Sequence, residues 1–416
     1  MRVLSKYNIV VIVMDTVRLD YFRAALADDP ELKEYARDYL DAGVCIAPSS
    51  WTLPSHASLL TGLYPSTHGA HETERVKDPD ISGLKLRVST MVSELNKMGY
   101  STWLFTANPL IAPIFGFDEF KYFRDMTDYY EDLNLRGGIH LGRKARELAE
   151  KKFGEDSVKG DSVGAILRSL VGVAGVEGLP TLLKVLWEGT KLTVSHDFRL
   201  TKLRLGSGLM LEKGGKKIKK AIQSTSFTEP FFVLVNLMEA HEPYFYRDQY
   251  ACEYNFKTFP ASFPGENLLN RWKQSYTMAV KQSARNAFEI ANWFRSHYRR
   301  NTLVVLTSDH GQAFLEHGYL GHGTVLYDEL VKVPFLVSST GTIGEPRVGG
   351  YASLVNFKRF ALSASAENPD FSLLFSKEVR AETFGTHLHP PRTPFDLGKY
   401  RGLNRPQTRV FNWADS

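Results

Sequence analysis

The stretch YNIVVIVMD, residues 7–15, is a run of apolar, mostly β-branched side chains that ends in a carboxylate. A continuous apolar run of this length is typical of a strand that is buried on both faces of a parallel sheet. Further runs of this kind occupy residues 99–106, 230–237, 302–307 and 333–338. Helical patterns lie between them, at residues 31–41, 55–62, 89–98 and 270–296. Strands that alternate with helices predict an α/β fold with a doubly wound, mostly parallel sheet flanked by helices.

Two regions of the 416-residue chain depart from this rhythm. Residues 125–225 contain several glycines, a basic run from Lys216 to Lys220 and an amphipathic stretch from Val163 to Trp187, which together predict an inserted, helical and basic cap. From about residue 345 the chain is rich in Gly, Ser and Pro. We therefore expect a main domain over residues 1–345 that carries the insert, and a small C-terminal appendage over residues 346–416.

Composition limits the class of protein and its partners. Apolar residues make up 43% of the chain and charged residues 23%, as in folded globular proteins. Residues 141–223 hold 17 Lys and Arg against 9 Asp and Glu, yet they contain no nucleic-acid-binding motif, so we expect no specific nucleic-acid partner and assign most of this charge to solvated surface.

Three features indicate a cytoplasmic protein. The two cysteines, Cys45 and Cys252, lie far apart, which argues against a disulfide framework and favours a reducing compartment. The apolar run from Ile9 to Met14 is too short for the core of a signal peptide. We find no uncharged apolar stretch of about 18 residues, so we expect no transmembrane segment.

Polar residues follow three of the predicted strands. Asp15 ends the first run, His241 follows the run at 230–237, and Asp309 and His310 follow the run at 302–307. Because ligands bind at the carboxyl ends of strands in open parallel sheets, we expect these side chains to converge. Two carboxylates and an imidazole suit one divalent metal ion, which could be Ca²⁺, Mn²⁺ or Zn²⁺.

A longer motif makes this interpretation specific. The run SSWTLPSHASLLTG, residues 49–62, resembles the signature of the sulfatase family, and Tyr64-Pro65 and His68-Gly69 continue that pattern. Four more motifs match in order: D-x-x-R-x-D from Asp15, H-x-P-Y at His241, S-D-H-G at Asp309, and G-H-G around His322 followed by Val333-Pro334. The resemblance covers about residues 7–340.

This resemblance implies an alkaline phosphatase-like fold and a metal-dependent hydrolase or transferase of phosphate or sulfate esters, whose substrate is a small molecule or a glycan. Sulfatases carry a Cys or Ser that becomes formylglycine where this chain has Thr52, and threonine is not a formylglycine precursor. Thr52 is instead similar to the nucleophile of the superfamily's phosphodiesterases and phosphoglycerol transferases. In those enzymes the threonine alkoxide is a metal ligand and attacks phosphorus.

The resemblance also implies roles for individual residues. The metal ligands would be Asp15, Thr52, Asp309 and His310, although Thr16 stands where sulfatases usually have a second ligand Asp. Either of two histidines, His241 and His322, would protonate the leaving oxygen or hold a nonbridging oxygen. His56 replaces the Arg of sulfatases and, with Asn108, is a candidate for substrate contact; Arg18 is a weaker candidate.

Several alternatives remain open at this point. The chain could be a true sulfuric ester hydrolase, or a catalytically inactive protein that kept the fold and binds anions. Thr52 could be a helix N-cap without chemistry. A second metal is disfavoured, because we find too few further Asp and His residues in the required order. The sequence does not indicate the alcohol part of the substrate or the oligomeric state.

Overall fold

The structure is a computed structural model. It describes residues 6–71, 86, 88–108, 110–111, 115–123, 213–242, 265–298, 301–341, 343, 349–366, 369–384 and 406–413. Within these ranges no helix combines the length and the apolar character that crossing a membrane requires.

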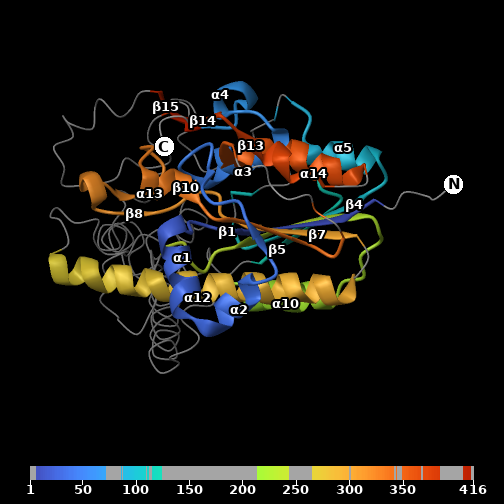
Figure 1. Ribbon diagram of the computed structural model, residues 1–416, viewed down its shortest axis with the longest axis horizontal. Coiled ribbons are helices and arrows are strands. Elements are labelled where there is room, and N and C mark those ends of the chain that lie inside the picture. The colour runs from blue at the N-terminus through green and yellow to red at the C-terminus, as the bar shows by residue number, and fades with distance from the viewer. Residues whose placement is uncertain are drawn as a thin grey trace, which may run out of the picture. The chain divides into compact units, whose positions relative to one another are not determined.

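A seven-stranded sheet forms the centre of the described chain (Figure 1), in the order β2-β11-β7-β1-β6-β4-β5. The bounds of its strands are β1 Asn8–Met14, β2 Leu40–Asp41, β4 Ser101–Thr106, β5 Glu119–Tyr122, β6 Phe231–Leu237, β7 Thr302–Thr307 and β11 Phe335–Ser339. Central strand β1 pairs in parallel with β6 and β7, so that Val10 lies between Val233 and Val304. Every residue of β1 is buried, as its apolar run predicts.

Helices cover both faces of this sheet (Figure 1). One layer holds α1 (Leu19–Asp28), α2 (Pro30–Ala36), α10 (Gly215–Gln223) and the long α12 (Glu266–His297), which contacts β1 and β7. The other layer holds α3 (Thr52–Thr61), α4 (Pro65–His68), α5 (Met91–Lys97) and α14 (Phe357–Ser365). Apolar side chains of β1 such as Val11 belong to one buried cluster with Leu59 of α3 and Phe357 of α14. The predicted α/β class is therefore confirmed.

Some elements differ from those that the sequence predicts. Helices α1 and α14 were not predicted, and the helix expected over 31–41 ends at Ala36. The run at 333–338 splits into β10 (Lys332–Val333) and β11, with Pro334 between them, which has no backbone N–H to donate to a ladder. Strand β11 pairs antiparallel with β7, so the sheet combines parallel pairing at its centre with antiparallel pairing at this edge.

A second, four-stranded sheet has the order β10-β3-β12-β13 and connects distant parts of the chain. It contains β3 (Cys45–Ile46), β12 (Tyr351–Ser353) and β13 (Phe375–Ser376). Cys45 is a buried free thiol, as expected for a structural cysteine. A two-stranded ribbon, β14 (Glu378–Thr383) with β15 (Gln407–Asn412), follows.

The predicted domain boundaries stay predictions. Most of the predicted insert, residues 124–212, lies outside the described residues, while α10 near its end packs against α12. In the predicted appendage, Ala352 of β12, Leu354 of the 3-10 turn that follows it and Phe357 of α14 belong to the same buried cluster as the central sheet.

Candidate active site

The predicted site residues gather at the carboxyl ends of the central strands. Asp15 follows β1, Asn108 follows β4, and Asp309 with His310 follows β7. Thr52 is the first residue of α3. All five side chains are buried, with exposed fractions of 2% or less. Ligand atoms of Asp15, Asp309 and His310 all lie within 4.8 Å of one another.

Thr52 lies at the N-terminus of a ten-residue helix, and Trp51 rather than Thr52 occupies the N-cap position. Its Oγ1 is 3.3 Å from His310 Nε2 and 3.5 Å from Asp15 Oδ2, to which it donates. Trp51 makes no side-chain cap hydrogen bond. The first-turn N–H groups and the helix dipole therefore favour negative charge beside this hydroxyl.

Each of the two carboxylates has one oxygen that accepts hydrogen bonds and one that does not. Asp15 Oδ2 accepts from Asn108 Nδ2 at 2.8 Å and from Asn236 Nδ2 at 3.3 Å. Asp309 Oδ1 accepts from the backbone N–H groups of Thr16 at 3.3 Å and His310 at 3.0 Å. Asp15 Oδ1 and Asp309 Oδ2 are buried and have no hydrogen-bond partner among the residues that the structure describes.

These two oxygens lie around one imidazole nitrogen. His310 Nε2 is 3.7 Å from Asp15 Oδ1 and 3.6 Å from Asp309 Oδ2. His310 Nδ1 is 2.9 Å from the carbonyl oxygen of Gly311, which can only accept, so Nδ1 carries the proton and Nε2 the lone pair. Buried oxygens without partners beside a basic nitrogen fit a divalent cation, because a cation would compensate their lost hydration.

The pKa shifts of Asp15, Asp309 and His310 agree with a cation site between these residues. Burial raises the pKa of the Asp15 carboxyl, but His241, His310 and the Asn108 amide outweigh it and hold the pKa below its usual value. Burial, and then the neighbouring Asp15 charge, raise the pKa of Asp309 well above its usual value. Burial lowers the pKa of His310 to about 4, so this imidazole is neutral near neutral pH.

A second group lies beside this one and contains His241 and His322. Their ring centroids are 5.1 Å apart, and the His322 ring is 4.6 Å from the His310 ring. His322 Nδ1 is 2.7 Å from Gln312 Oε1, and Glu242 Oε2 is 3.6 Å from Nδ1 of both histidines. Burial lowers the pKa of His322 to about 3. The ring distances place His241 and His322 together beside the candidate metal centre.

The order of these motifs agrees with one protein family. The family model described as Sulfatase matches residues 7–365 of this chain. The chain belongs to the sulfatase family. Its motif at residues 49–62 forms α3 and the loop before it, which in this sulfatase-family chain brings Thr52 to the carboxylates.

Among curated proteins, the chain is similar to the low-salt glycan biosynthesis sulfotransferase Agl7 of Haloferax volcanii, with 32% identity over 141 residues, 32% of this chain and 33% of that protein. It is also similar to the uncharacterized sulfatase YidJ of Escherichia coli, with 26% identity over 27% of each chain. The matches thus span about a third or less of these relatives.

Solved structures share the fold at low sequence identity. The phosphonate monoester hydrolase SpPMH of Silicibacter pomeroyi has a TM-score of 0.62 at 15% identity and covers 98% of this chain and 85% of that one. BT1596, a 2-O GAG sulfatase, has a TM-score of 0.55 at 13% identity and covers 92% of this chain and 79% of that one. Both confirm the alkaline phosphatase-like α/β fold expected from the sequence.

The structure brings together every residue that the sequence singles out for the metal and the chemistry. The two candidates for substrate contact, Asn108 and His56, differ in their surroundings. Asn108 Nδ2 contacts Asp15 and lies 3.4 Å from Thr52 Oγ1. His56 is 1% exposed and lies behind the site, with Nδ1 3.0 Å from the Thr52 carbonyl oxygen and 3.5 Å from Asp309 Oδ2.

Arg18, the weaker candidate, binds other protein groups. It forms ion pairs with Asp20 and Glu316, both at 2.7 Å, and donates to the carbonyl oxygen of Gln312 at 3.2 Å. Its guanidinium therefore stabilises the loop that carries Gln312.

Sequence reasoning missed Glu242, which lies beside His241 and His322, and three further residues that contact site groups. Asn236 donates to Asp15, Gln312 bonds to His322, and buried Lys213 donates through Nζ to the carbonyl oxygen of His241. Asn236 had a signal, because it is the one polar residue near the end of an apolar strand. Gln312 and Lys213 had no such signal, since their contacts with His322 and His241, 10 and 28 residues away, depend on how the loops fold.

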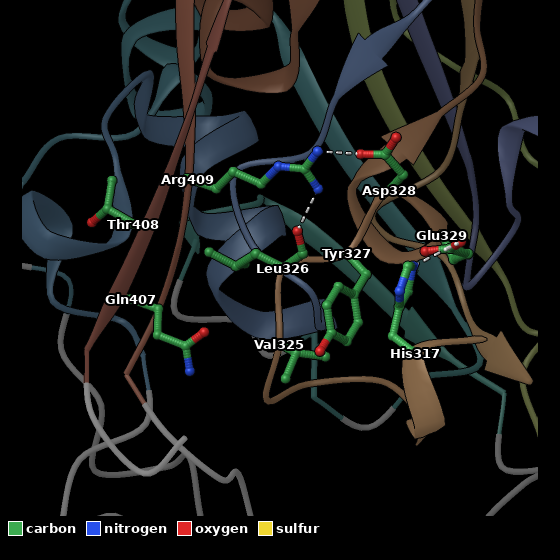
Figure 2. Close-up of a pocket in the computed structure, with 9 residues that line it drawn as sticks. All are labelled: His317, Val325, Leu326, Tyr327, Asp328, Glu329, Gln407, Thr408 and Arg409. Carbon is green, nitrogen blue, oxygen red and sulfur yellow. Dashed lines mark hydrogen bonds and ion pairs between the residues drawn. The ribbon is translucent and has the colours of Figure 1, made fainter. Parts of the chain in front are cut away.

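A separate hollow of about 700 Å³ lies between β15 and the segment formed by α13 (Asp328–Val331) and the loop before it. None of its lining residues is among the predicted site residues. Figure 2 shows Arg409 directed at Asp328 and at the carbonyl oxygen of Leu326, and His317 directed at Glu329. These contacts measure 2.5, 2.9 and 3.6 Å. Its charged side chains thus pair with one another, and we assign it no role.

Proposed function

We propose that this chain is a metal-dependent enzyme that hydrolyses or transfers phosphate or sulfate esters through a covalent ester on Thr52. The observation that carries the proposal is the convergence of Thr52 Oγ1 with His310 Nε2, at 3.3 Å, beside the unpartnered oxygens of Asp15 and Asp309. Family membership supports it, because the same motifs in the same order form this group.

Asp15 Oδ1, Asp309 Oδ2 and His310 Nε2 would hold the cation, which could be Ca²⁺, Mn²⁺ or Zn²⁺. When bound, a divalent cation lowers the pKa of the neighbouring hydroxyl and offsets the negative charge of the ester. Asn108 and Asn236 hold Asp15 in position from its other oxygen, and two backbone N–H groups do so for Asp309.

Thr52 is the proposed nucleophile. Asp15 Oδ2, to which the hydroxyl donates, takes up its proton as the Thr52 oxygen forms a bond to phosphorus or sulfur and the bond from that atom to the alcohol oxygen breaks. The N-terminus of α3 stabilises the negative charge on the transferred group. Water, or a second alcohol in a transferase, then attacks the Thr52 ester and restores the hydroxyl.

His241 or His322 would protonate the leaving oxygen or hold a nonbridging oxygen. Both imidazoles lie on the same side of the site, 5.1 Å apart between ring centroids. Neighbouring Glu242 has its pKa held at about 2, because His241 and His322 outweigh the effect of its burial. A carboxylate that stays charged can orient both rings.

We place phosphate esters, including phosphodiesters, before sulfate esters as substrates. Thr52 supports this order, because it is not a precursor of formylglycine. A small molecule or a glycan is the proposed carrier of the ester. We also propose that the protein works in the cytoplasm, which the buried free thiol of Cys45 supports.

The test compares Thr52→Ala with Thr61→Ala, a second buried threonine of the same helix. Turnover of bis-nitrophenyl phosphate and nitrophenyl sulfate is measured in parallel, with circular dichroism to monitor folding. Loss of the nucleophile should lower turnover of the preferred ester by about 10³-fold or more, whereas Thr61→Ala should stay near wild type. Wild-type activity in a folded Thr52→Ala protein would refute the proposal.

Two alternatives lead to different results in the same assays. A true sulfuric ester hydrolase would turn over the sulfate and not the phosphate. A catalytically inactive anion-binding protein would take up metal fully and turn over neither ester. Mass spectrometry of the Thr52 peptide after rapid acid quench would detect the covalent ester in the enzyme and not in the binding protein.

A further inference from the structure

The turn that leads from β1 into α1 contains a strained residue. Thr16 has a φ of 60°, and within the described ranges no other β-branched residue has a positive φ. The backbone N–H of Val17 donates to the carbonyl oxygen of Met14, so Thr16 takes the third position of a turn, which glycine or asparagine usually fills when φ is positive. A β-branched side chain in this conformation is costly, and such strain clusters at functional sites. Other contacts must therefore hold Thr16 in place.

The strained backbone of Thr16 contacts one of the two site carboxylates. Its N–H donates to Asp309 Oδ1 at 3.3 Å, while Oδ2 of that carboxylate has no hydrogen-bond partner among the described residues. The Thr16 hydroxyl is used locally, because it donates to the carbonyl oxygen of Asp15 at 2.7 Å. Thr16 therefore contributes to the site through its backbone N–H.

The hydroxyl of Tyr276, a residue of α12, bonds to the backbone on both sides of Val17. It donates to the carbonyl oxygen of Thr16 at 2.5 Å and accepts from the backbone N–H of Arg18 at 3.0 Å. Tyr276 is fully buried, and its ring packs against the ring of Phe314 with the centroids 4.9 Å apart. Because packing fixes the ring, the hydroxyl has a defined position and its two bonds restrict the turn.

Ser308 makes a second link to the same turn. Its Oγ accepts from the backbone N–H of Val17 at 2.9 Å and donates to the carbonyl oxygen of His310 at 2.7 Å. This link joins two segments that both carry proposed metal ligands. Tyr276 instead connects the turn to α12, the long helix that contacts β1 and β7. The tyrosine thus ties the turn to the body of the fold.

We infer that Tyr276 is a positioning residue for the candidate metal centre. Its hydroxyl keeps Thr16 in the strained conformation. That conformation fixes Asp15 at the end of β1 and directs the Thr16 N–H to Asp309 Oδ1, so that the second oxygen of each carboxylate stays available to the cation. The inference rests on the proposed function, because it assumes a cation held by these two carboxylates and His310.

The affinity for Mn²⁺ tests this role without relying on turnover. Chelated protein is titrated with Mn²⁺, and electron paramagnetic resonance measures the free ion. Tyr276→Phe removes the hydroxyl and keeps the ring. It should weaken Mn²⁺ binding by about 10- to 100-fold, as expected when a group that orients metal ligands is removed.

Tyr100→Phe is the matched control. Tyr100 is buried, and its hydroxyl also donates to a backbone carbonyl oxygen, that of Tyr7, at 2.9 Å. Both residues directly precede strands, β4 and β1, and therefore lie at the opposite edge of the sheet from the site. Tyr100→Phe should bind Mn²⁺ as wild type does.

Thr16→Gly provides a readout that a purely structural role of Tyr276 would not change. Glycine adopts a positive φ without steric cost and keeps the backbone N–H, so the turn should depend less on the tyrosine hydroxyl. Adding Tyr276→Phe to Thr16→Gly should therefore weaken Mn²⁺ binding by less than about threefold, because the two residues act on the same turn and their effects do not add.

Circular dichroism shows which variants fold. A Mn²⁺ affinity of folded Tyr276→Phe that stays within about twofold of wild type would overturn the inference. An equal loss with Thr16 and with Gly at position 16 would also overturn it, because general packing would then explain the loss. If Tyr276→Phe folds only together with Thr16→Gly, relief of the strain supports the inference. If it folds in neither background, Tyr276 serves the fold alone and the inference fails.

The same titration separates this inference from the proposed function. Wild type that binds Mn²⁺ and a Tyr276→Phe variant that binds it equally well would refute only the role of Tyr276. If wild type takes up neither Mn²⁺, Ca²⁺ nor Zn²⁺, the metal centre of the proposed function is refuted together with the inference.

Discussion

Asn108 donates from Nδ2 to Asp15 Oδ2 at 2.8 Å and thereby links the end of β4 to the end of β1 across β6, the strand that lies between them. Asn236, which belongs to β6 itself, donates to the same oxygen at 3.3 Å. Asp15 therefore has one oxygen held by an amide of β6 and by an amide at the end of β4, and its other oxygen is directed at His310.

Asn108→Ala should lower kcat by about 10- to 100-fold, because a hydrogen bond to a charged group contributes roughly 1.5–3 kcal/mol. Steady-state kinetics with the preferred ester would measure the effect. Asn96→Ala is the matched control, since the Asn96 amide bonds to Gly116 and Asp118 and contacts no site residue. A kcat for Asn108→Ala within twofold of wild type would contradict a role in holding Asp15.

His56 contacts Thr52 and Asp309 from behind, which predicts an effect on metal affinity. His56→Leu should weaken the affinity for the cation by about 10- to 100-fold, as expected when a group that orients a metal ligand is removed. His56→Asn should recover part of it, because the Asn amide can still donate to the Thr52 carbonyl oxygen. Titration with Mn²⁺ would measure the affinities. A raised KM with unchanged Mn²⁺ affinity would instead show that His56 contacts substrate.

His68 is buried and is not one of the proposed catalytic groups. Its lowered pKa predicts that the free energy of unfolding depends on pH. Burial lowers its pKa from 6.5 to about 4, and its Nδ1 accepts from the backbone N–H of Ala70 at 3.0 Å, so the folded state holds it neutral. Between these two pKa values the unfolded chain binds the proton and the folded chain does not. Stability should therefore fall as the pH drops from 6.5 towards 4, with a contribution from His68 of up to about 3 kcal/mol.

Urea unfolding of wild type and His68→Gln at several pH values would check this. Other buried histidines contribute to both proteins, so the difference between the two curves isolates His68. That difference should change with pH between 6.5 and 4 and level off below 4. Parallel curves over this range would show that His68 takes up no extra proton on unfolding.

Gly215 begins α10 where the backbone lies against Glu239. The backbone N–H of Gly215 donates to Glu239 Oε1 at 2.9 Å, and a Cβ at this position would collide with Glu239 and with Asn286. Gly215→Ala should therefore lower the free energy of unfolding by about 1–3 kcal/mol. Gly265→Ala is the control, because a Cβ there would meet no atom within 4 Å. Equal denaturant midpoints for the two variants would contradict the close packing.

Local sequence patterns were sufficient for the central sheet and for the core of the site. Largely apolar runs predicted β1, β4, β6 and β7, because strands inside a parallel sheet that is covered by helices on both faces carry mostly apolar side chains. Asp15, Asp309 and His310 could be predicted together, since parallel strands direct their carboxyl ends to one edge of the sheet.

Tertiary structure decided which atoms of these residues remain available. The sequence names Asp15 and Asp309, but only the packed chain shows that Asn108, Asn236 and two backbone N–H groups occupy one oxygen of each. The packed chain also places Glu242 Oε2 3.6 Å from His322 Nδ1, and His56 Nδ1 3.5 Å from Asp309 Oδ2. Hydrogen bonds between segments that are tens to hundreds of residues apart leave no periodic trace in the sequence, because they depend on how strands and helices pack rather than on local conformation.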